Sequence, residues 1–290
     1  MKFVPYWHLA KHRVNAPFWH GGPGSVRCWG WSETSAAEAE ARARERVARV
    51  AQRMEAGEEL PHGYGYPDRP MREPVLREFR DDQGELTAAL TRNGYGCVVL
   101  NTARLMFVDI DLEENLTASI GRWFKSLFGE RKAPSKRVSL EERLQAIATW
   151  TQSRPGWGWR VYQTRAGLRL LASHAWFDPK SNDTQTVFEE LGADPLYARL
   201  CRNQECFRAR LTPKPWRCGW HACRVRWPFR DPRAQGAYAK WEQSYLRKAA
   251  QRATCRFLHT LGNETVLGEA ADLIQLHDET TRAESGLPLA

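Results

Sequence analysis

The stretch RLMFVDIDLEE, residues 104–114, is the strongest indication of fold and function in this chain. Its apolar half predicts a buried β-strand, and that strand ends in two carboxylates, Asp109 and Asp111. Side chains two residues apart on a strand point to the same face, so these two carboxylates repel and raise each other's pKa. A divalent cation relieves such a pair, because hard cations prefer carboxylate oxygens. The stretch therefore predicts Mg²⁺ or Mn²⁺ at Asp109 and Asp111; the alternative is a solvated strand end at which Asp111 caps the following segment.

Composition favours a nucleic-acid partner and no membrane. A length of 290 residues is enough for one large domain or two small ones, and a hydrophobic content of 42% supports a core. A net charge of +9 suits phosphates, and the thirteen Trp could stack on bases. There is no 18-residue apolar run to span a membrane. With an odd number of Cys, seven, and no secretory signal, we expect a reducing cytoplasm and no disulfides.

The order of expected elements predicts an α+β fold. A strand at 25–32 precedes a helix that Ser35 and Glu38 begin as a capping box and that Gly57 ends. Strand segments follow within 85–101 and 104–112, then a helix from Ser139, and two strand segments on either side of the turn TRAG at 164–167. This βαββαβ order is that of the ferredoxin-like or RRM-like sheet, which is also the palm of several polymerases.

Two domains are expected. Residues 1–232 form the RRM-like catalytic or nucleic-acid-binding domain, which includes a basic insertion at 115–137 and a segment at 201–223 rich in Cys, Arg and Trp. Residues 233–290 form a helical extension with helices at 234–260 and 266–277 and a frayed end.

Three segments carry side chains suited to phosphate. Arg92 precedes a strand, YQTRAGLRLL (162–171) contains a turn, and CFRARLTPKPWR (206–217) places two Arg on one strand face. Gly167 lets the backbone approach a ligand, and guanidinium groups fork onto phosphate oxygens. The candidates are Arg92, Thr164, Arg165, Arg169, Arg208, Arg210 and Lys214. The alternative is Arg side chains that pair with acidic neighbours or form a basic surface patch.

Four cysteines have a spacing that zinc could use. Cys201, Cys206, Cys218 and Cys223 form two C-x4-C pairs, and His221 inside the second pair is an alternative ligand. Two close thiolate pairs are typical of a structural Zn²⁺ site. The alternative is four small buried side chains, since Cys is among the most buried residue types.

VDID at a strand end and TRAGLR on a later strand resemble the archaeo-eukaryotic primase superfamily, which includes the primase-polymerases of plasmids and phages. The resemblance covers about residues 85–231. Asp109 and Asp111 match the family's carboxylate pair. TRAGLR matches part of its second motif, with Arg169 in the place of the family's His, or with His174 supplying that His.

The resemblance also implies a third acidic residue, for which Asp231 is the candidate and Asp194 the rival. It implies a nucleotidyltransferase that uses Mg²⁺ or Mn²⁺, nucleoside triphosphates and a nucleic-acid template. Two other functions stay open at this point: a non-catalytic RNA- or DNA-binding protein with a structural zinc, and a two-metal nuclease that uses the same Asp pair.

Overall fold

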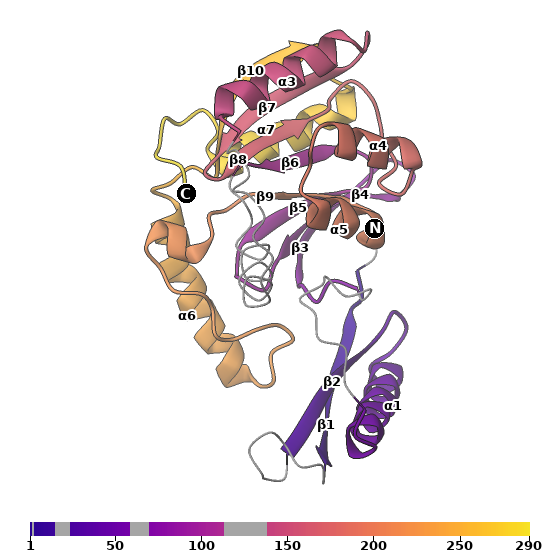
Figure 1. Ribbon diagram of the computed structural model, residues 1–290. Coiled ribbons are helices and arrows are strands. Elements are labelled where there is room, and N and C mark those ends of the chain that lie inside the picture. The colour runs from indigo at the N-terminus through magenta and orange to yellow at the C-terminus, as the bar shows by residue number, and fades with distance from the viewer. Residues whose placement is uncertain (2, 15–23, 59–69, 113–137) are drawn as a thin grey trace, which may run out of the picture. The chain divides into compact units, whose positions relative to one another are not determined.

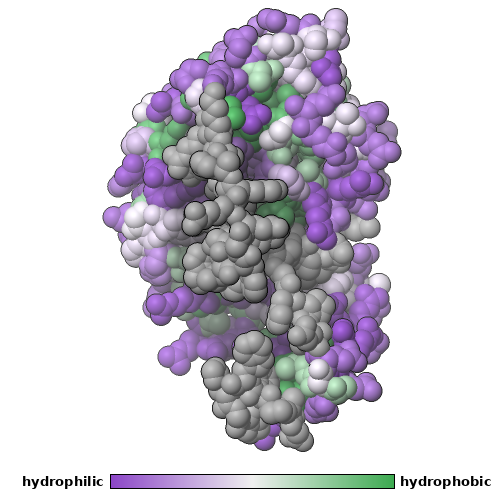
Figure 2. All heavy atoms as spheres, viewed as in Figure 1, coloured by the Kyte–Doolittle hydropathy of each residue, from purple (hydrophilic) through white to green (hydrophobic). Residues whose placement is uncertain are grey.

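The computed structural model describes residues 1, 3–14, 24–58, 70–112 and 138–290 (Figure 1). The chain divides into two compact units, residues 2–72 and residues 73–290 with Met1. All pairs of named strands are antiparallel, so the fold is mixed α+β. Figure 2 shows that hydrophilic residues predominate among the coloured residues of one face. The expected basic insertion at 115–137 lies outside the described residues.

The smaller unit is a hairpin packed on one helix. Strands β1 (Tyr6–Val14) and β2 (Gly24–Ser32) pair with each other, and α1 (Ala36–Glu55) follows. Ser35 caps α1 by accepting from the backbone of Glu38. A Cβ added at Gly30 would lie 2.3 Å from the backbone of Ala39 and Ala43, so small residues let the helix touch the strand directly.

The larger unit contains two four-stranded sheets. The first sheet has the order β10-β7-β8-β6, and the second has the order β3-β4-β5-β9. The strands of the first are β6 (Phe107–Asp111), β7 (Gly158–Thr164), β8 (Gly167–Leu171) and β10 (Cys255–Gly262). Those of the second are β3 (Val75–Arg80), β4 (Leu86–Arg92), β5 (Val98–Thr102) and β9 (Phe207–Arg210).

Two helices cover opposite faces of the first sheet. Helix α3 (Leu140–Gln152) brings Trp150 to 5.8 Å from Trp159 of β7, measured between ring centroids. Helix α7 (Gly268–Thr281) brings His277 to 4.8 Å from Tyr162 of the same strand. Residues 159 and 162 point to opposite faces of a strand, so α3 and α7 lie on opposite sides. Figure 1 shows α3 lying along β7 and β10.

The connection from β6 to β7 is a split β-α-β unit. Both strands are antiparallel to β8, which lies between them, so β6 and β7 are parallel and α3 joins them. Between β8 and β9 the chain forms α4 (Asn182–Glu190) and α5 (Pro195–Gln204). The short helix η1 (Pro215–Cys218) and α6 (Pro232–Ala249) follow β9.

The sheet expected from the sequence is not confirmed. The strand expected at 25–32 and the helix after it do form, but as β2 and α1 of the smaller unit, where β2 pairs with β1. The segment at 85–101 forms β4 and most of β5, which belong to the second sheet, whereas β6 belongs to the first. The order of elements along a chain does not state which strands pair, and here it gave the wrong sheet.

The C-terminal segment also differs from its expectation. Helix α6 ends at Ala249, and Cys255–Gly262 is a strand paired with β7 instead of the end of a long helix. The last residue is not frayed, because Ala290 is buried and its backbone N–H donates to the carbonyl of Ala253 at 3.0 Å. Residues 233–290 belong to the same compact unit as the two sheets.

Candidate functional site

One row of facing residues crosses the first sheet beneath α7. Asp109 of β6 lies opposite Arg169 of β8, which lies opposite Tyr162 of β7, which lies opposite Phe257 of β10. The row is continuous because the three strand pairs are in register at this level. It sets Arg169 between a carboxylate and an aromatic ring, on the face that α7 covers.

Arg169 is an interior partner of Asp109. Its Nε and Nη2 donate to the two oxygens of Asp109 at 2.8 and 3.2 Å, and its Nη1 donates to the carbonyl of Arg210 at 3.0 Å. The residue is 1% exposed. Each of the three guanidinium nitrogens already donates to a protein acceptor, and solvent does not reach the group. Arg169 is therefore not exposed to a triphosphate, and the expectation that it binds one is corrected.

A chain of hydrogen bonds continues from Arg169 into α7. Burial lowers the pKa of His277, so its ring is neutral at pH 7 and its Nε2, 3.4 Å from Nη1 of Arg169, can accept. Nδ1 of His277 then donates to Asp278 at 2.8 Å, and Asp278 accepts from Arg160 at 2.7 Å. Sequence reasoning did not find His277 and Asp278, and no motif marks them.

Asp111 lies two residues beyond Asp109 at the end of β6, on the same face of the strand. It faces Gly167, where an added Cβ would lie 1.9 Å from the carbonyl oxygen of Ile110, so only glycine fits there. Asp111 is exposed, yet the protein atoms around its carboxylate take away enough water to raise its pKa. The negative charges of Asp194 and Asp109 raise it further, to about 6, against the opposing effect of Lys214 and Arg210.

Separate elements bring these charges to Asp111. Asp194 caps α5 by accepting from the backbone of Leu196 at 2.9 Å, and its own N–H donates to the carbonyl of Asp109 at 3.0 Å. Arg210 ends β9, and Lys214 precedes η1. We call the group of Asp109, Asp111, Asp194, Arg210 and Lys214 the strand-end site.

The two cations of the strand-end site, Arg210 and Lys214, lie in surroundings that do not fully stabilise their charges. The pKa of Lys214 is lowered, first by burial and then by the positive charges of Arg210 and Arg217. Nε of Arg210 is buried without a hydrogen-bond partner among the described residues. An anion placed between Arg210 and Lys214 would relieve both conditions.

Two other expected phosphate ligands are internal. Arg92 is 6% exposed, pairs with Glu242 of α6 and donates to the carbonyl of Gly96. Arg208 is 7% exposed, and its Nη2 donates to both oxygens of Glu73 at 2.9 Å. Both guanidinium groups join separate parts of the larger unit, and neither is placed in the strand-end site.

The remaining candidates of the TRAG segment separate from one another. Thr164 ends β7, and Arg165 is exposed in the turn between β7 and β8. His174 follows the far end of β8, with Nδ1 3.1 Å from the carbonyl of Gly158. Because a strand rises by about 3.3 Å per residue, His174 lies at the other end of the sheet from Asp111.

The third acidic residue of the group is Asp194. The other candidate, Asp231, caps α6 by accepting from the backbone of Ala234 at 2.7 Å and pairs with Arg230 at 3.0 Å. The carboxylates that act on Asp111 are those of Asp194 and Asp109. The sequence named Asp194 only as the rival to Asp231.

The four cysteines occupy two different surroundings. Cys201 is part of the main core and Cys206 is buried near it, whereas Cys218 and Cys223 pack against aromatic residues of α6. The thiols of Cys218 and Cys223 donate to backbone carbonyls at 3.2 and 3.1 Å. Within the described ranges no group of three or more His, Cys, Asp or Glu is placed to hold a metal ion. Zinc at these cysteines, with or without His221, stays a prediction.

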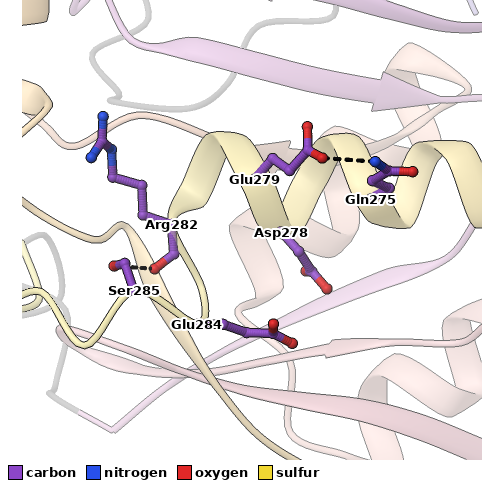
Figure 3. Close-up of a pocket in the computed structure, with 6 residues that line it drawn as sticks. All are labelled: Gln275, Asp278, Glu279, Arg282, Glu284 and Ser285. Atoms are coloured by element: carbon purple, nitrogen blue, oxygen red, sulfur yellow. Dashed lines mark hydrogen bonds between the residues drawn. The ribbon is translucent and has the colours of Figure 1, made fainter.

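A surface hollow at the end of α7 has the wrong charge for phosphate. Its lining includes Asp278, Glu279 and Glu284 with Arg282 as the cation, and Gln275 donates to Glu279 at 2.7 Å (Figure 3). Three carboxylates against one guanidinium repel an anion. The strand-end site is therefore the better candidate.

No family model, curated protein or solved structure matches this chain. In the part of the chain that the structure describes, no helix is both long enough and apolar enough to cross a membrane.

Proposed function

We propose that this protein is a metal-dependent nucleotidyltransferase of the primase-polymerase type that acts on nucleic acid and nucleoside triphosphates. One observation carries the proposal: Asp111 has two further carboxylates and two cations as its main electrostatic neighbours. Carboxylates suit a divalent cation, and Arg and Lys suit the phosphates that such a cation accompanies.

The topology around β6 supports a ferredoxin-like palm. The βαββαβ order begins at β6 instead of residue 25, and runs β6, α3, β7, β8, the helices α4 and α5, and β9. In that order the Asp pair lies at the end of the first strand. The departure is that β9 pairs with β5 of the second sheet instead of with β6.

The carboxylates fit a magnesium ion that is held together with substrate. Mg²⁺ usually takes one or two protein carboxylates and completes its shell with water and substrate phosphates. Asp111 and Asp194 can supply that number, and the Asp109 side chain, though paired with Arg169, keeps 33% exposure. Burial, and then the charges of Asp194 and Asp109, raise the pKa of Asp111, and a bound cation would stabilise its ionised form.

Each residue of the strand-end site then has a separate task. Asp111 and Asp194 would hold Mg²⁺ or Mn²⁺, which supplies activation of a hydroxyl nucleophile and charge neutralisation at the leaving pyrophosphate. Arg210 and Lys214 would bind triphosphate oxygens. Arg169 fixes the orientation of Asp109 from below. Arg165, exposed in the adjacent turn, is a further candidate for phosphate contact.

Nucleotide incorporation tests the proposal. The purified chain is incubated with a primed and an unprimed template, labelled nucleoside triphosphates and Mn²⁺ or Mg²⁺, and products are resolved by length. We expect metal-dependent elongation that Asp111→Asn reduces by at least about a hundredfold, because metal-assisted stabilisation is worth several kcal/mol. Asp82→Asn, an exposed change in the β3–β4 turn, is the matched control and should leave activity intact.

A non-catalytic nucleic-acid-binding module is the second candidate. This function is favoured by the ion pair between Asp109 and Arg169, because the guanidinium already neutralises the charge that a metal ion would otherwise neutralise. Binding of oligonucleotide without incorporation under any metal would assign this function. Shortened strands in place of extended ones would assign a two-metal nuclease, and metal analysis of the purified protein tests zinc at the cysteines.

A further inference from the structure

The smaller unit has a two-stranded sheet with two chemically different faces. Ala10, Val14, Val26 and Gly30 are buried against α1, so the even-numbered residues of β1 and β2 point toward the helix. The odd-numbered residues occupy the other face, where the facing pairs are Trp7 with Trp31, Leu9 with Trp29, Lys11 with Arg27 and Arg13 with Ser25. We call this the odd face.

One half of the odd face is aromatic. The ring of Trp7 lies 6.4 Å from that of Trp29 and 5.6 Å from that of Trp31, measured between centroids. Leu9 beside them is 40% exposed. The guanidinium of Arg72 lies 4.1 Å from the centre of the Trp29 ring. Partly exposed indoles with a cation at their side are the usual platform for unpaired bases.

The other half of the odd face is basic and uncompensated. Lys11, Arg13 and Arg27 are exposed, and none forms an ion pair with a residue that the structure describes. Neither strand contains a single Asp or Glu. Cations that pair with no acidic side chain raise the local concentration of an anion, and they do not have to break an ion pair in order to bind it.

Helix α1 of the same unit shows the contrast. Three of its five Arg side chains pair with a Glu four residues away, each at 2.5 Å; the pairs are Arg42 with Glu38, Arg44 with Glu40 and Arg49 with Glu45. The helix is therefore close to neutral along its exposed side. Among the described residues of this unit, net positive charge is concentrated on the odd face.

We propose that the odd face binds a single strand of nucleic acid, with bases against the indoles and phosphates on Lys11, Arg13 and Arg27. Nine residues of strand extend about 30 Å, which accommodates several nucleotides. A duplex hides the base faces that indoles recognise, so a single strand fits better. This site lies in a separate unit and does not depend on the chemistry at the strand-end site.

Salt-dependent binding of the full chain tests the cations. Anisotropy is measured with a fluorescein-labelled thymidine 20-mer over a salt series. The test variant removes the strand cations (Lys11→Ala, Arg13→Ala, Arg27→Ala), and the control removes as much charge from α1 (Arg42→Ala, Arg44→Ala, Arg49→Ala). Each phosphate contact on a single strand contributes about 0.7 to the slope of log affinity against log salt, so the test variant should lose about 2 units.

The affinities themselves give the second readout. At 0.15 M salt we expect the test variant to bind at least about tenfold more weakly, and the control to stay within about threefold of the wild type. A duplex of the same length should bind at least about tenfold more weakly than the single strand. Equal losses in both variants, or an unchanged slope in the test variant, would overturn the proposal, and equal affinity for duplex would overturn the single-strand assignment.

The aromatic half has its own variant. Leu9→Glu places a carboxylate among the indoles at an exposed position, and Leu76→Glu, 46% exposed on β3 of the larger unit, is its control. We expect Leu9→Glu alone to weaken binding by about tenfold, with unchanged circular dichroism. Wild-type affinity in Leu9→Glu would contradict the base-binding role. Binding of the 20-mer is measured without divalent metal or nucleoside triphosphate, so a chain that fails to incorporate nucleotides would leave this proposal standing.

Discussion

Replacing Arg169 with Met is expected to destabilise the larger unit strongly. Met is unbranched and apolar, and it fills much of the volume without supplying a donor. The change removes both hydrogen bonds to Asp109 and leaves the carbonyl of Arg210 and Nε2 of His277 without that donor. Because Arg169 is 1% exposed, water cannot replace it at the buried acceptors.

The magnitude follows from these losses. Breaking a buried ion pair by removing one partner costs about 3–5 kcal/mol. The Asp109 side chain is 33% exposed and can recover some hydration, so we expect the lower end, about 3 kcal/mol. For a unit of this size that corresponds to a melting temperature lower by about 6–12 °C.

Urea unfolding at pH 7.5, followed by circular dichroism and Trp fluorescence, measures the change. Arg165→Met in the exposed turn removes the same charge and should stay within about 0.5 kcal/mol of the wild type. Adding Asp109→Leu to Arg169→Met should recover part of the loss, because no unpaired carboxylate remains. Near-wild-type stability of Arg169→Met together with nucleotide affinity about tenfold weaker would refute this reasoning and make Arg169 a ligand-binding residue.

Three further outcomes are expected. Gly167→Ala should lower the free energy of unfolding in urea by about 1–3 kcal/mol or more, because the new Cβ would lie 1.9 Å from the carbonyl oxygen of Ile110. The control is Gly84→Ala: Gly84 has a positive φ but open space around it, so this change measures backbone strain without a steric clash. Burial lowers the pKa of His277, so as the pH falls the unfolded chain binds a proton at this residue before the folded chain does, and stability falls below about pH 6.5. His277→Gln should make that fall in stability shallower by up to about 1.4 kcal/mol per pH unit. The control His259→Gln, at an exposed position, should leave the slope unchanged. The pKa of Asp111 is raised to about 6, so the cost of its ionisation to folding builds up between about pH 4 and 6 and is complete above pH 6. Asp111→Asn should therefore raise the melting temperature in EDTA at pH 7.5 and lose that advantage at pH 4. An equal gain at both pH values would contradict the electrostatic cause.

Local patterns determined where α1 and α3 begin and the strand that carries the Asp pair. Ser35 caps α1 and Ser139 with Glu142 forms the capping box of α3, because a cap involves only residues within one turn. The alternation that puts Asp109 and Asp111 on one face is likewise local, and so is the turn between β7 and β8. These features require no knowledge of distant residues.

Strand pairing and the partner of each charged side chain were decided only by the tertiary structure. The sequence presents Arg169, Arg208 and Arg210 as equivalent basic residues on strands. The fold buries the first against Asp109 and the second against Glu73, and leaves the third beside Asp111. The contacts of Arg169 and Arg208 join residues 60 and 135 positions apart. Such contacts follow from which strands become neighbours, and a local pattern does not contain that information.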